Sequence, residues 1–276
     1  MPHSVEAEQG VVEAFLEYYA PNSDGSLPDA NDLEVQYGRK NLDLKSVKVG
    51  DMRSRDFKLE EDGFTLMKHE SAMTDFTDRE KVKKEYYPEV AEAIKKHTGA
   101  SKVICFNHNV RSTALPGLDL QKQKVDHVGP MRRVHIDVAP GGVSEAVTKR
   151  AGEEFMSKFQ GRWKIMNAWK PIRTVERDPL GVAVAASVPD EDLINLKRYR
   201  PDGSLSESRY AVKAGEGHQW YYVPQQRTDE MILFTQYSDN PNRGIADRVA
   251  HCAFILPGTE DKPVRESVEV RALVVF

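Results

Sequence analysis

Short apolar segments separated by turn-forming residues fill the second half of the chain. Seven of them follow one another after residue 161: RWKIMNAWKPI, GVAVAASV, SRYAVKA, HQWYYVP, EMILFTQY, VAHCAFIL and ESVEVRALVVF. KVICFNHNV and MRRVHIDV add two more before them. In several of these segments apolar and polar residues alternate, which is the period of a strand with one buried face. Short strands at such regular spacing predict a β-sandwich or barrel.

Two other segments show helical spacing. Residues 77–97 carry apolar side chains at intervals of four, Asp78 or the threonine before it can cap the start, and Pro88 is expected to kink or split the helix. Residues 145–160 are expected to form a second amphipathic helix. The first 60 residues are polar and rich in turn formers, so they predict an N-terminal arm with one strand or helical turn.

We expect a single domain over residues 1–276, because a chain of this length can bury one full core. Residues 1–60 form its arm, residues 61–100 its helical support, and residues 101–276 its β core, with a helical insertion near 145–160. The predicted class is therefore mainly β with flanking helices.

Composition narrows the classes of function. The net charge of -4 gives no basic footprint for nucleic acid, and no apolar run approaches the ~20 residues that span a bilayer. The first ten residues lack the basic and apolar regions of a secretory signal, and two cysteines make no disulfide framework. We expect a cytoplasmic protein that binds a small molecule and has no nucleic-acid or membrane partner. The oligomeric state stays open, a homodimer included.

The segment RRVHIDVAP carries the first candidate chemistry. Side chains alternate along a strand, so His135 and Asp137 share one face and the β-branched residues around them share the other. One interpretation is a solvent-facing pair on a half-buried strand. The other is a metal site, which needs a further ligand from elsewhere in the chain.

His251 supplies that ligand in the second interpretation. It lies in the apolar segment RVAHCAFILP, and a closed double sheet would return this late strand to the side of the early one. Two histidines and one carboxylate on one face of a metal form the ligand set of non-haem Fe(II) oxygenases, with three positions open. Zinc accepts the same ligands, so the residue types leave the metal open.

The last predicted strand carries a candidate anion site. Arg265 and Ser267 share a face, and a guanidinium with a nearby hydroxyl can hold a carboxylate such as that of 2-oxoglutarate. A solvated polar face is the alternative. Arg271 lies on the same face and competes for the role, roughly 20 Å along the strand at ~3.3 Å per residue. Arg265 is preferred because it is closer to His251 in sequence and has the serine nearby.

Three strands place polar or aromatic side chains on one face. The candidate substrate contacts from these strands are Asn107, Arg111, Asn167, Trp169, Trp220 and Tyr222. Aromatic side chains with a few polar groups are typical of small-molecule pockets. The alternatives are that Arg111 is a surface charge or part of an ion pair, and that the aromatic residues belong to the core.

The order H-x-D, distal histidine, R-x-S resembles the Fe(II)/2-oxoglutarate-dependent oxygenases, and more closely the fungal hydroxylase/desaturase family of natural-product biosynthesis. The likeness runs from GFTLMKHESAMTDF through TGASKVICFNHNVRS, NAWKPI, PLGVAVAASV and HQWYYVPQQRTDEMILFTQYSD to RESVEVRALVVF. It implies a double-stranded β-helix, the jelly-roll core that cupins also have.

The resemblance also implies the site and its chemistry. Fe(II) would be bound by His135, Asp137 and His251, and 2-oxoglutarate by Arg265. O₂ would be the second cosubstrate. The protein would be a dioxygenase, an oxidoreductase that hydroxylates, desaturates or cyclises a small secondary metabolite by C–H abstraction and releases succinate and CO₂.

Two positions depart from the family pattern. Lys170 stands where an arginine usually follows the tryptophan, and Val184 stands where relatives often carry an aspartate. Both concern details of the pocket, and neither is one of the three ligands. Two other functions stay open here. A cupin-like metal- or ligand-binding protein without turnover would keep the fold, and a zinc-dependent hydrolase would share the ligands but need a general base near its water.

Overall fold

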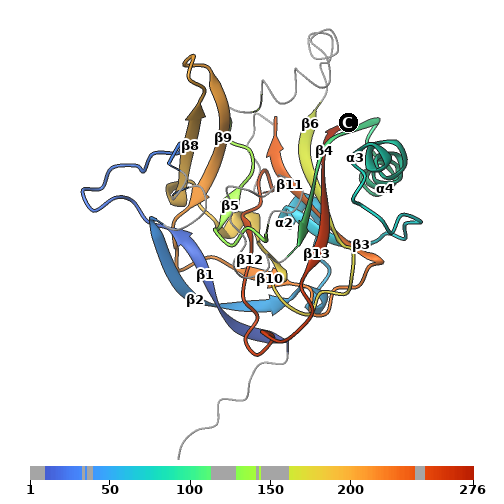
Figure 1. Ribbon diagram of the computed structural model, residues 1–276, viewed down its shortest axis with the longest axis horizontal. Helices are drawn as coiled ribbons and strands as arrows, with labels where there is room; N and C mark the ends of the chain where they lie inside the picture. Colours follow the sequence, from blue (N-terminus) through green and yellow to red (C-terminus); the bar gives the residue numbers. More distant parts are fainter. Residues whose placement is uncertain are drawn as a thin grey trace, which may run out of the picture.

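The computed structural model describes residues 10–32, 35, 40–112, 129–140, 143, 162–239 and 246–276. These residues form two β-sheets with helices along one side, as Figure 1 shows. The predicted class, mainly β with flanking helices, is confirmed. The helix expected over residues 145–160 lies outside the described residues.

In the described part of the chain the larger sheet has eight strands, in the order β1-β2-β10-β7-β12-β5-β9-β8. Their bounds are β1 Val11–Tyr19, β2 Leu42–Asp51, β5 His135–Ile136, β7 Leu180–Ala183, β8 Leu193–Tyr199, β9 Leu205–Val212, β10 Trp220–Tyr222 and β12 His251–Ala253. Neighbouring strands are antiparallel except β2 and β10, which are parallel. The order places strands that are far apart in sequence side by side.

The smaller sheet pairs its strands antiparallel in the order β3-β11-β6-β13-β4. Their bounds are β3 Phe64–Lys68, β4 Lys102–Ser112, β6 Trp163–Pro171, β11 Glu230–Ser238 and β13 Glu266–Val275. Val268 and Val270 of β13 pack into the core under the helices. Ser267 and Arg271 therefore face the opposite way, toward the other sheet, as the alternation predicts.

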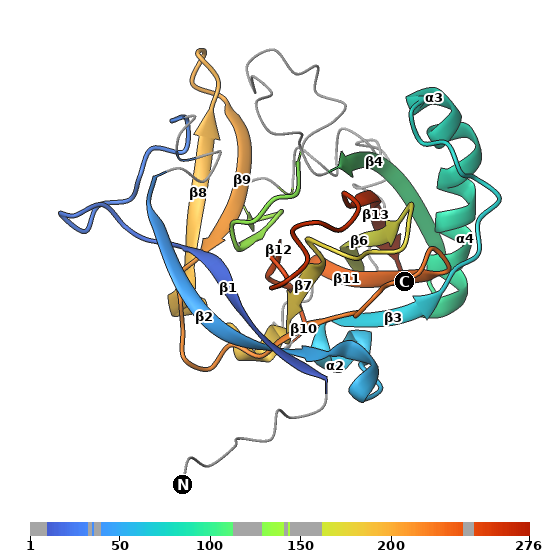
Figure 2. The same ribbon diagram turned by 60° about the horizontal axis from the view of Figure 1, so that its bottom comes forward.

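The segment predicted as an N-terminal arm supplies β1 and β2, which pair along their whole length. β2 continues the sheet to β10, with Val49 opposite Trp220. On the other side of β1, the Val134 amide donates to the Glu17 carbonyl at 2.9 Å, and Glu17 forms a bridge with Arg133. The larger sheet therefore curls, so that β1 lies beside the segment that carries the H-x-D motif, as Figure 2 shows.

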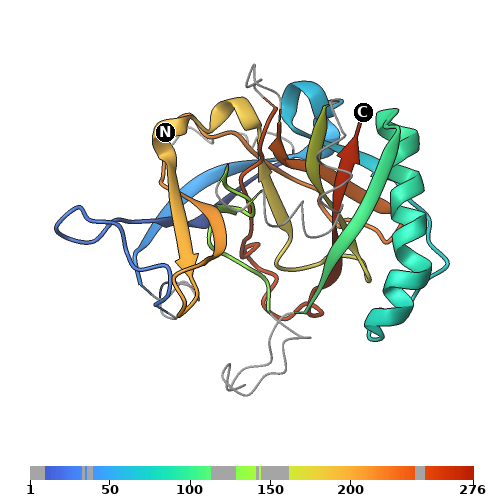
Figure 3. The same cartoon turned by 90° about the horizontal axis from the view of Figure 1, so that it is seen from above.

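The helix predicted over residues 77–97 is present. It consists of α3 Arg79–Lys81, a π-helical turn Val82–Tyr86 and α4 Tyr87–Thr98. Figure 3 shows α4 lying along the outer face of β4 and β13. The shorter elements in the described part of the chain are α2 Leu59–Asp62 and three 3₁₀ turns, Met52–Ser54, Ala185–Ser187 and Asp190–Asp192.

Local chemistry sets the ends of this helix. Asp78 caps its start by accepting from two amides of the first turn, and Gly99 ends it with a φ of 70°. Pro88 does not break the chain of helical turns. It lies in the first turn of α4, directly after the π-helical turn, where its missing N–H is tolerated.

Three of the apolar clusters in the described residues form layers around the two sheets. One layer packs α4 onto the smaller sheet, and a second, around Phe64 and Phe234, lies between the sheets. A third layer, around Tyr18 and Trp220, lies on the other face of the larger sheet under β1. The polar face of β13 is therefore directed into the space between the sheets.

Candidate metal centre

Strands β5 and β12 bring the three predicted metal ligands together. His135 and His251 lie opposite each other in this strand pair, with ring centroids 4.2 Å apart. Asp137 follows β5, and its carboxylate oxygens lie 3.6 Å from Nε2 of His135 and 3.8 Å from Nε2 of His251. One ligand atom from each residue lies within 4.8 Å of the others, so one ion can contact all three.

Each imidazole is oriented by a backbone carbonyl two residues earlier. Nδ1 of His135 lies 2.7 Å from the Arg133 carbonyl, and Nδ1 of His251 lies 3.3 Å from the Val249 carbonyl. A carbonyl only accepts, so each Nδ1 carries the proton and each Nε2 keeps its lone pair. Both histidines are buried, which contradicts the solvent-facing interpretation of the H-x-D strand.

The protonation states suit a divalent cation. Burial, with His251 adding to its effect, lowers the pKa of His135 to about 3, so this ring is neutral at pH 7. Burial by itself would raise the pKa of Asp137, but the positive charge of Arg271 and the hydrogen bond from Asn167 hold that pKa well below its usual range. A neutral imidazole and an ionised carboxylate are the forms that bind metal.

Two side chains of the smaller sheet hold the Asp137 carboxylate. Nη2 of Arg271 lies 2.6 Å from Oδ2, and Nδ2 of Asn167 donates to the same oxygen at 2.7 Å. Arg271 and Asn167 are opposite each other in β13 and β6, and Nε of Arg271 donates to Oδ1 of Asn167 at 3.2 Å. Arg271 is farther from His251 in sequence than Arg265 but still contacts a predicted ligand, because β13 runs back alongside the centre. Asn167, a candidate substrate contact, instead contacts a ligand.

Gln236 joins the two ligand-bearing segments from a β-bulge in β11. The bulge falls between Thr235 and Tyr237, where the pairing with β6 skips a residue. The buried side-chain amide of Gln236 accepts from the Asp137 backbone N–H at 2.7 Å and donates to the Val249 carbonyl at 3.3 Å. Sequence reasoning missed this residue. The available signal was an amide within an otherwise apolar strand.

Gln236→Leu is expected to weaken the fold and metal binding together. The buried Asp137 amide loses its acceptor, which should cost about 1–3 kcal/mol in the free energy of unfolding. The link to Val249 is also lost, so the Kd for Mn(II) should rise. Urea denaturation and Mn(II) titration measure the two effects. Gln226→Leu is the control, because Gln226 is equally buried but bonds to the Glu230 carbonyl, away from the ligands. An unchanged Mn(II) Kd in Gln236→Leu would contradict the positioning role.

Arg265 lies in a buried, positively charged environment just before β13. Its Nη1 donates to the Asp178 carbonyl at 2.9 Å, and its guanidinium lies 5.5 Å from the centre of the Trp169 ring. Burial, and then the nearby Arg111, lower the pKa of Arg265 to about 9, so the group stays charged at pH 7. The buried Ser267 hydroxyl has no hydrogen-bond partner among the described residues. An anion would complete such a site.

Comparison with known proteins decides the family. The protein-family description "Oxidoreductase/YMDC permease-like domain" matches residues 16–275. The chain is 62% identical to the "Alpha-ketoglutarate-dependent dioxygenase tstK" of Talaromyces stipitatus, over 100% of both sequences. It is 32% identical to the "Hydroxylase/desaturase efuI" of Hormonema carpetanum, over 96% of this chain and 95% of that one. The chain belongs to the fungal hydroxylase/desaturase family of Fe(II)/2-oxoglutarate-dependent oxygenases.

A solved structure supports the same assignment. The iron and alpha-ketoglutarate-dependent endoperoxidase NvfI aligns with a TM-score of 0.77 at 26% identity, over 97% of this chain and 99% of that one. The expected jelly-roll core of the oxygenase is confirmed by this match. The comparisons favour a dioxygenase over the zinc hydrolase and the binder without turnover. Within the described residues, no helix is long and apolar enough to cross a membrane.

Three of the oxygenase's candidate substrate contacts lie on the inner face of the smaller sheet. Asn107 and Arg111 of β4 are opposite Arg271 and Ser267 of β13. Trp169 of β6 packs in the apolar layer between the sheets. These three side chains therefore share the space that the metal ligands face.

The structure excludes Trp220 and Tyr222 from the metal centre. Val182 pairs with both His251 and Tyr221, so Tyr221 shares the ligand face and its two neighbours point away from it. Trp220 instead donates from Nε1 to a tyrosine hydroxyl of β1 at 2.7 Å, in the core under that strand. Alternation identified the two faces of β10 correctly, but it could not tell which face was the inner one.

The two departures from the family pattern lie away from the three ligands. Lys170 is on the outer face of β6, where its Nζ donates to the His69 carbonyl at 2.9 Å. Val184 is buried in the apolar layer between the sheets. Neither side chain bonds to a ligand residue, so neither departure changes the donor set of the oxygenase.

Proposed function

We propose that His135, Asp137 and His251 bind one Fe(II) ion. The convergence of their ligand atoms within 4.8 Å, with His135 neutral and Asp137 ionised, is the observation that carries this proposal. Two histidines and a carboxylate on one side of an octahedral ion leave three positions open for cosubstrates. The contacts of Arg271 and Asn167 with one carboxylate oxygen support the proposal further, because they leave the other oxygen for the metal.

Arg265 and Ser267 form the proposed seat for the distal carboxylate of 2-oxoglutarate. The carboxylate would offset the repulsion between Arg265 and Arg111 and accept a hydrogen bond from the Ser267 hydroxyl. Arg271 is the weaker candidate, because its Nη2 and Nε atoms already bind Asp137 and Asn167.

The proposed reaction is oxidation of a C–H bond, with hydroxylation, desaturation or ring closure as its outcome. Fe(II), 2-oxoglutarate and O₂ supply the oxidant when bound, and succinate and CO₂ are released. The chain positions the metal ligands and shields the centre from water. Arg271 keeps Asp137 ionised, the backbone carbonyls orient the imidazoles, and the Phe234 ring, 4.9 Å from His251, excludes water from one side of the centre.

The proposed substrate is a small secondary metabolite, a proposal supported by relatives named "Gibberellin cluster GA4 desaturase" and "Aspirochlorine biosynthesis protein N". The enzyme would act as one domain over residues 1–276 in the cytoplasm, without a nucleic-acid or membrane partner. A family match that spans residues 16–275 without a break supports the single domain, and the net charge of -4 supports the lack of a nucleic-acid partner.

Addition of Fe(II) and 2-oxoglutarate to the metal-free protein without O₂ should produce the weak visible charge-transfer band of the iron chelate. The band should saturate at about one Fe(II) per chain, because the three ligands form a single site. Zn(II) is the control. Its filled d shell gives no such band at equal occupancy. Iron that binds at this stoichiometry without the band would contradict the proposed 2-oxoglutarate chelation.

A further inference from the structure

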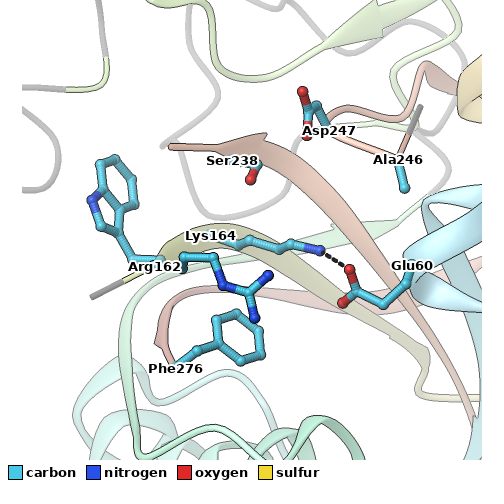
Figure 4. Close-up of a pocket in the computed structure, with 8 residues that line it drawn as sticks. Glu60, Arg162, Lys164, Ser238, Ala246, Asp247 and Phe276 are labelled. Carbon is cyan, nitrogen blue, oxygen red and sulfur yellow. Dashed lines mark hydrogen bonds and ion pairs between the residues drawn. The ribbon is translucent and has the colours of Figure 1, made fainter. Parts of the chain in front are cut away.

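Two cavities differ in whether their cationic side chains already have partners. The larger, of about 120 Å³, lies near α2 and the end of the chain, and its cations are already engaged. Lys164 binds Glu60 at 2.8 Å, and the guanidinium of Arg162 lies 5.8 Å from the centre of the Phe276 ring, as Figure 4 shows. The smaller cavity, of about 20 Å³, lies against the proposed iron ligand His135.

The smaller cavity lies on the same sheet face as the iron ligands. His135 pairs with Ala211, and Arg209 lies two residues before Ala211 on β9, so His135 and Arg209 point to the same side. Tyr19 of β1 and Arg133 add polar groups to the lining, and the remaining lining residues are Val35, Met131, Val134, Leu196, Tyr210 and Ala211. Figure 2 shows the β8–β9 hairpin rising beside β1 and β2 at this side of the molecule.

Two buried hydrogen-bond donors that have no acceptor among the described residues line this cavity, together with the half-buried Arg209. Tyr19 is 2% exposed, and its hydroxyl has no hydrogen-bond partner among the described residues. Arg133 uses both Nη atoms on backbone carbonyls, but its buried Nε has no partner in the same part of the chain. Arg209 is half-buried and forms no ion pair with a carboxylate of the described residues. Unpaired buried donors are unfavourable, so an acceptor is expected beside the Tyr19 hydroxyl and Nε of Arg133.

The charge balance indicates an anionic acceptor. The positive charges of Arg133 and Arg209 both lower the pKa of Tyr19, against the effect of burial. Glu17 is the carboxylate whose charge opposes that of Arg133. Among the described residues that these interactions link, the two arginines therefore outnumber the one carboxylate. Burial raises the pKa of Tyr19 to about 12, so at neutral pH this residue presents a neutral O–H donor. Charge-assisted hydrogen bonds to an anion are stronger than those to a neutral acceptor.

We propose that Tyr19, Arg133 and Arg209, the Arg209 subsite, bind a carboxylate group of the substrate. The proposal rests on the proposed function, because the subsite orients a substrate only if His135 is an iron ligand. The cavity exceeds the ~10–15 Å³ that one water needs but is far smaller than a whole metabolite, so it takes one charged end. The rest of the substrate lies on the ligand face. The enzyme is therefore selective for acidic metabolites and oxidises a C–H bond near the carboxylate.

Propionate and its neutral analogue propionamide test the subsite. The protein is first loaded with Fe(II) and 2-oxoglutarate without O₂, so that both proposed cofactor positions are filled. Each probe, labelled with ¹³C, is then titrated and its binding followed by NMR. The wild-type protein should bind propionate roughly 10-fold more tightly than propionamide, as expected for a charged acceptor. Arg209→Gln should abolish this preference. Tyr19→Phe should reduce it without lowering the Tm, because the hydroxyl has no partner to lose within the described chain.

Arg198→Gln is the matched control. Arg198 lies on the neighbouring β8, pairs with Glu207 at 3.8 Å and does not line the cavity, so its loss removes the same charge without touching the subsite. Equal affinity of the wild-type protein for both probes would mean a water-filled cavity and would overturn the proposal. A preference that survives Arg209→Gln, or one that Arg198→Gln also abolishes, would overturn it as well. The visible band of the chelate, recorded on the same samples, separates these outcomes from failure of the iron and 2-oxoglutarate assignment, which would remove the band.

Discussion

Asp137→Ala and His135→Ala are each expected to abolish turnover and stoichiometric Fe(II) binding. Each change removes one of three protein ligands, and the loss of affinity should exceed the ~10–100-fold that follows when a residue that only orients a ligand is changed. Iron content after anaerobic loading and desalting measures the effect. His108→Ala is the control, because His108 is also buried but lies on the helix side, where it bonds to the Tyr87 hydroxyl at 2.9 Å.

The two variants should differ in stability. Asp137→Ala leaves the mostly buried guanidinium of Arg271 without its carboxylate, and removal of one partner of a buried ion pair costs up to about 3–5 kcal/mol. His135→Ala removes a neutral ring and should cost less. The double variant Asp137→Ala/Arg271→Met should recover stability in urea denaturation but not iron. Retained activity in either single variant would refute the ligand assignment. A double variant no more stable than Asp137→Ala would refute the account of Arg271.

Local periodicity explains the correct part of the sequence prediction. Strand alternation depends only on backbone geometry, so it assigned Ser267 and Arg271 to one face of β13 before any contact was known. The H-x-D spacing likewise placed His135 and Asp137 on one side of a strand. The pairing of His135 with His251 depended on chain order and on a closed double sheet, and the structure has both.

The features that could not be predicted from the sequence depend on which strands become neighbours. Trp220 and Tyr222 share a face, but only the pairing of β10 with β7 shows that this face is turned away from the ligands. Gln236 reaches Asp137 because a bulge shifts the register of β11, and a one-residue insertion leaves no periodic signal. The contact of Arg271 with Asp137 could not be predicted for a related reason, since distance along the chain says little about distance across a sheet.

Arg265→Lys is expected to weaken 2-oxoglutarate binding, and Arg271→Lys is expected to weaken Fe(II) binding. Lysine keeps the charge but lacks the planar fork that binds a carboxylate with two parallel bonds. At Arg265 the loss of this fork should weaken the binding of the cosubstrate. The KM for 2-oxoglutarate should therefore rise by about 10-fold or more, while Fe(II) affinity changes little. At Arg271 the loss should fall on Asp137, because that guanidinium contacts Oδ2 at 2.6 Å and also bonds to Asn167. There the Kd for Fe(II) should rise by roughly 10–100-fold.

Parallel measurement of the Fe(II) Kd and the 2-oxoglutarate KM in both variants separates the two roles. The KM must be determined at saturating iron, since a weakened metal site would otherwise raise it indirectly. Ser267→Ala is the third variant. It removes the buried hydroxyl that the proposed carboxylate would use, and should raise the KM less than Arg265→Lys because a neutral donor contributes less than a charged one. If Arg271→Lys raised the KM more than Arg265→Lys at saturating iron, the 2-oxoglutarate anchor would be Arg271, and the contact of Arg271 with Asp137 would have to open for the cosubstrate to bind.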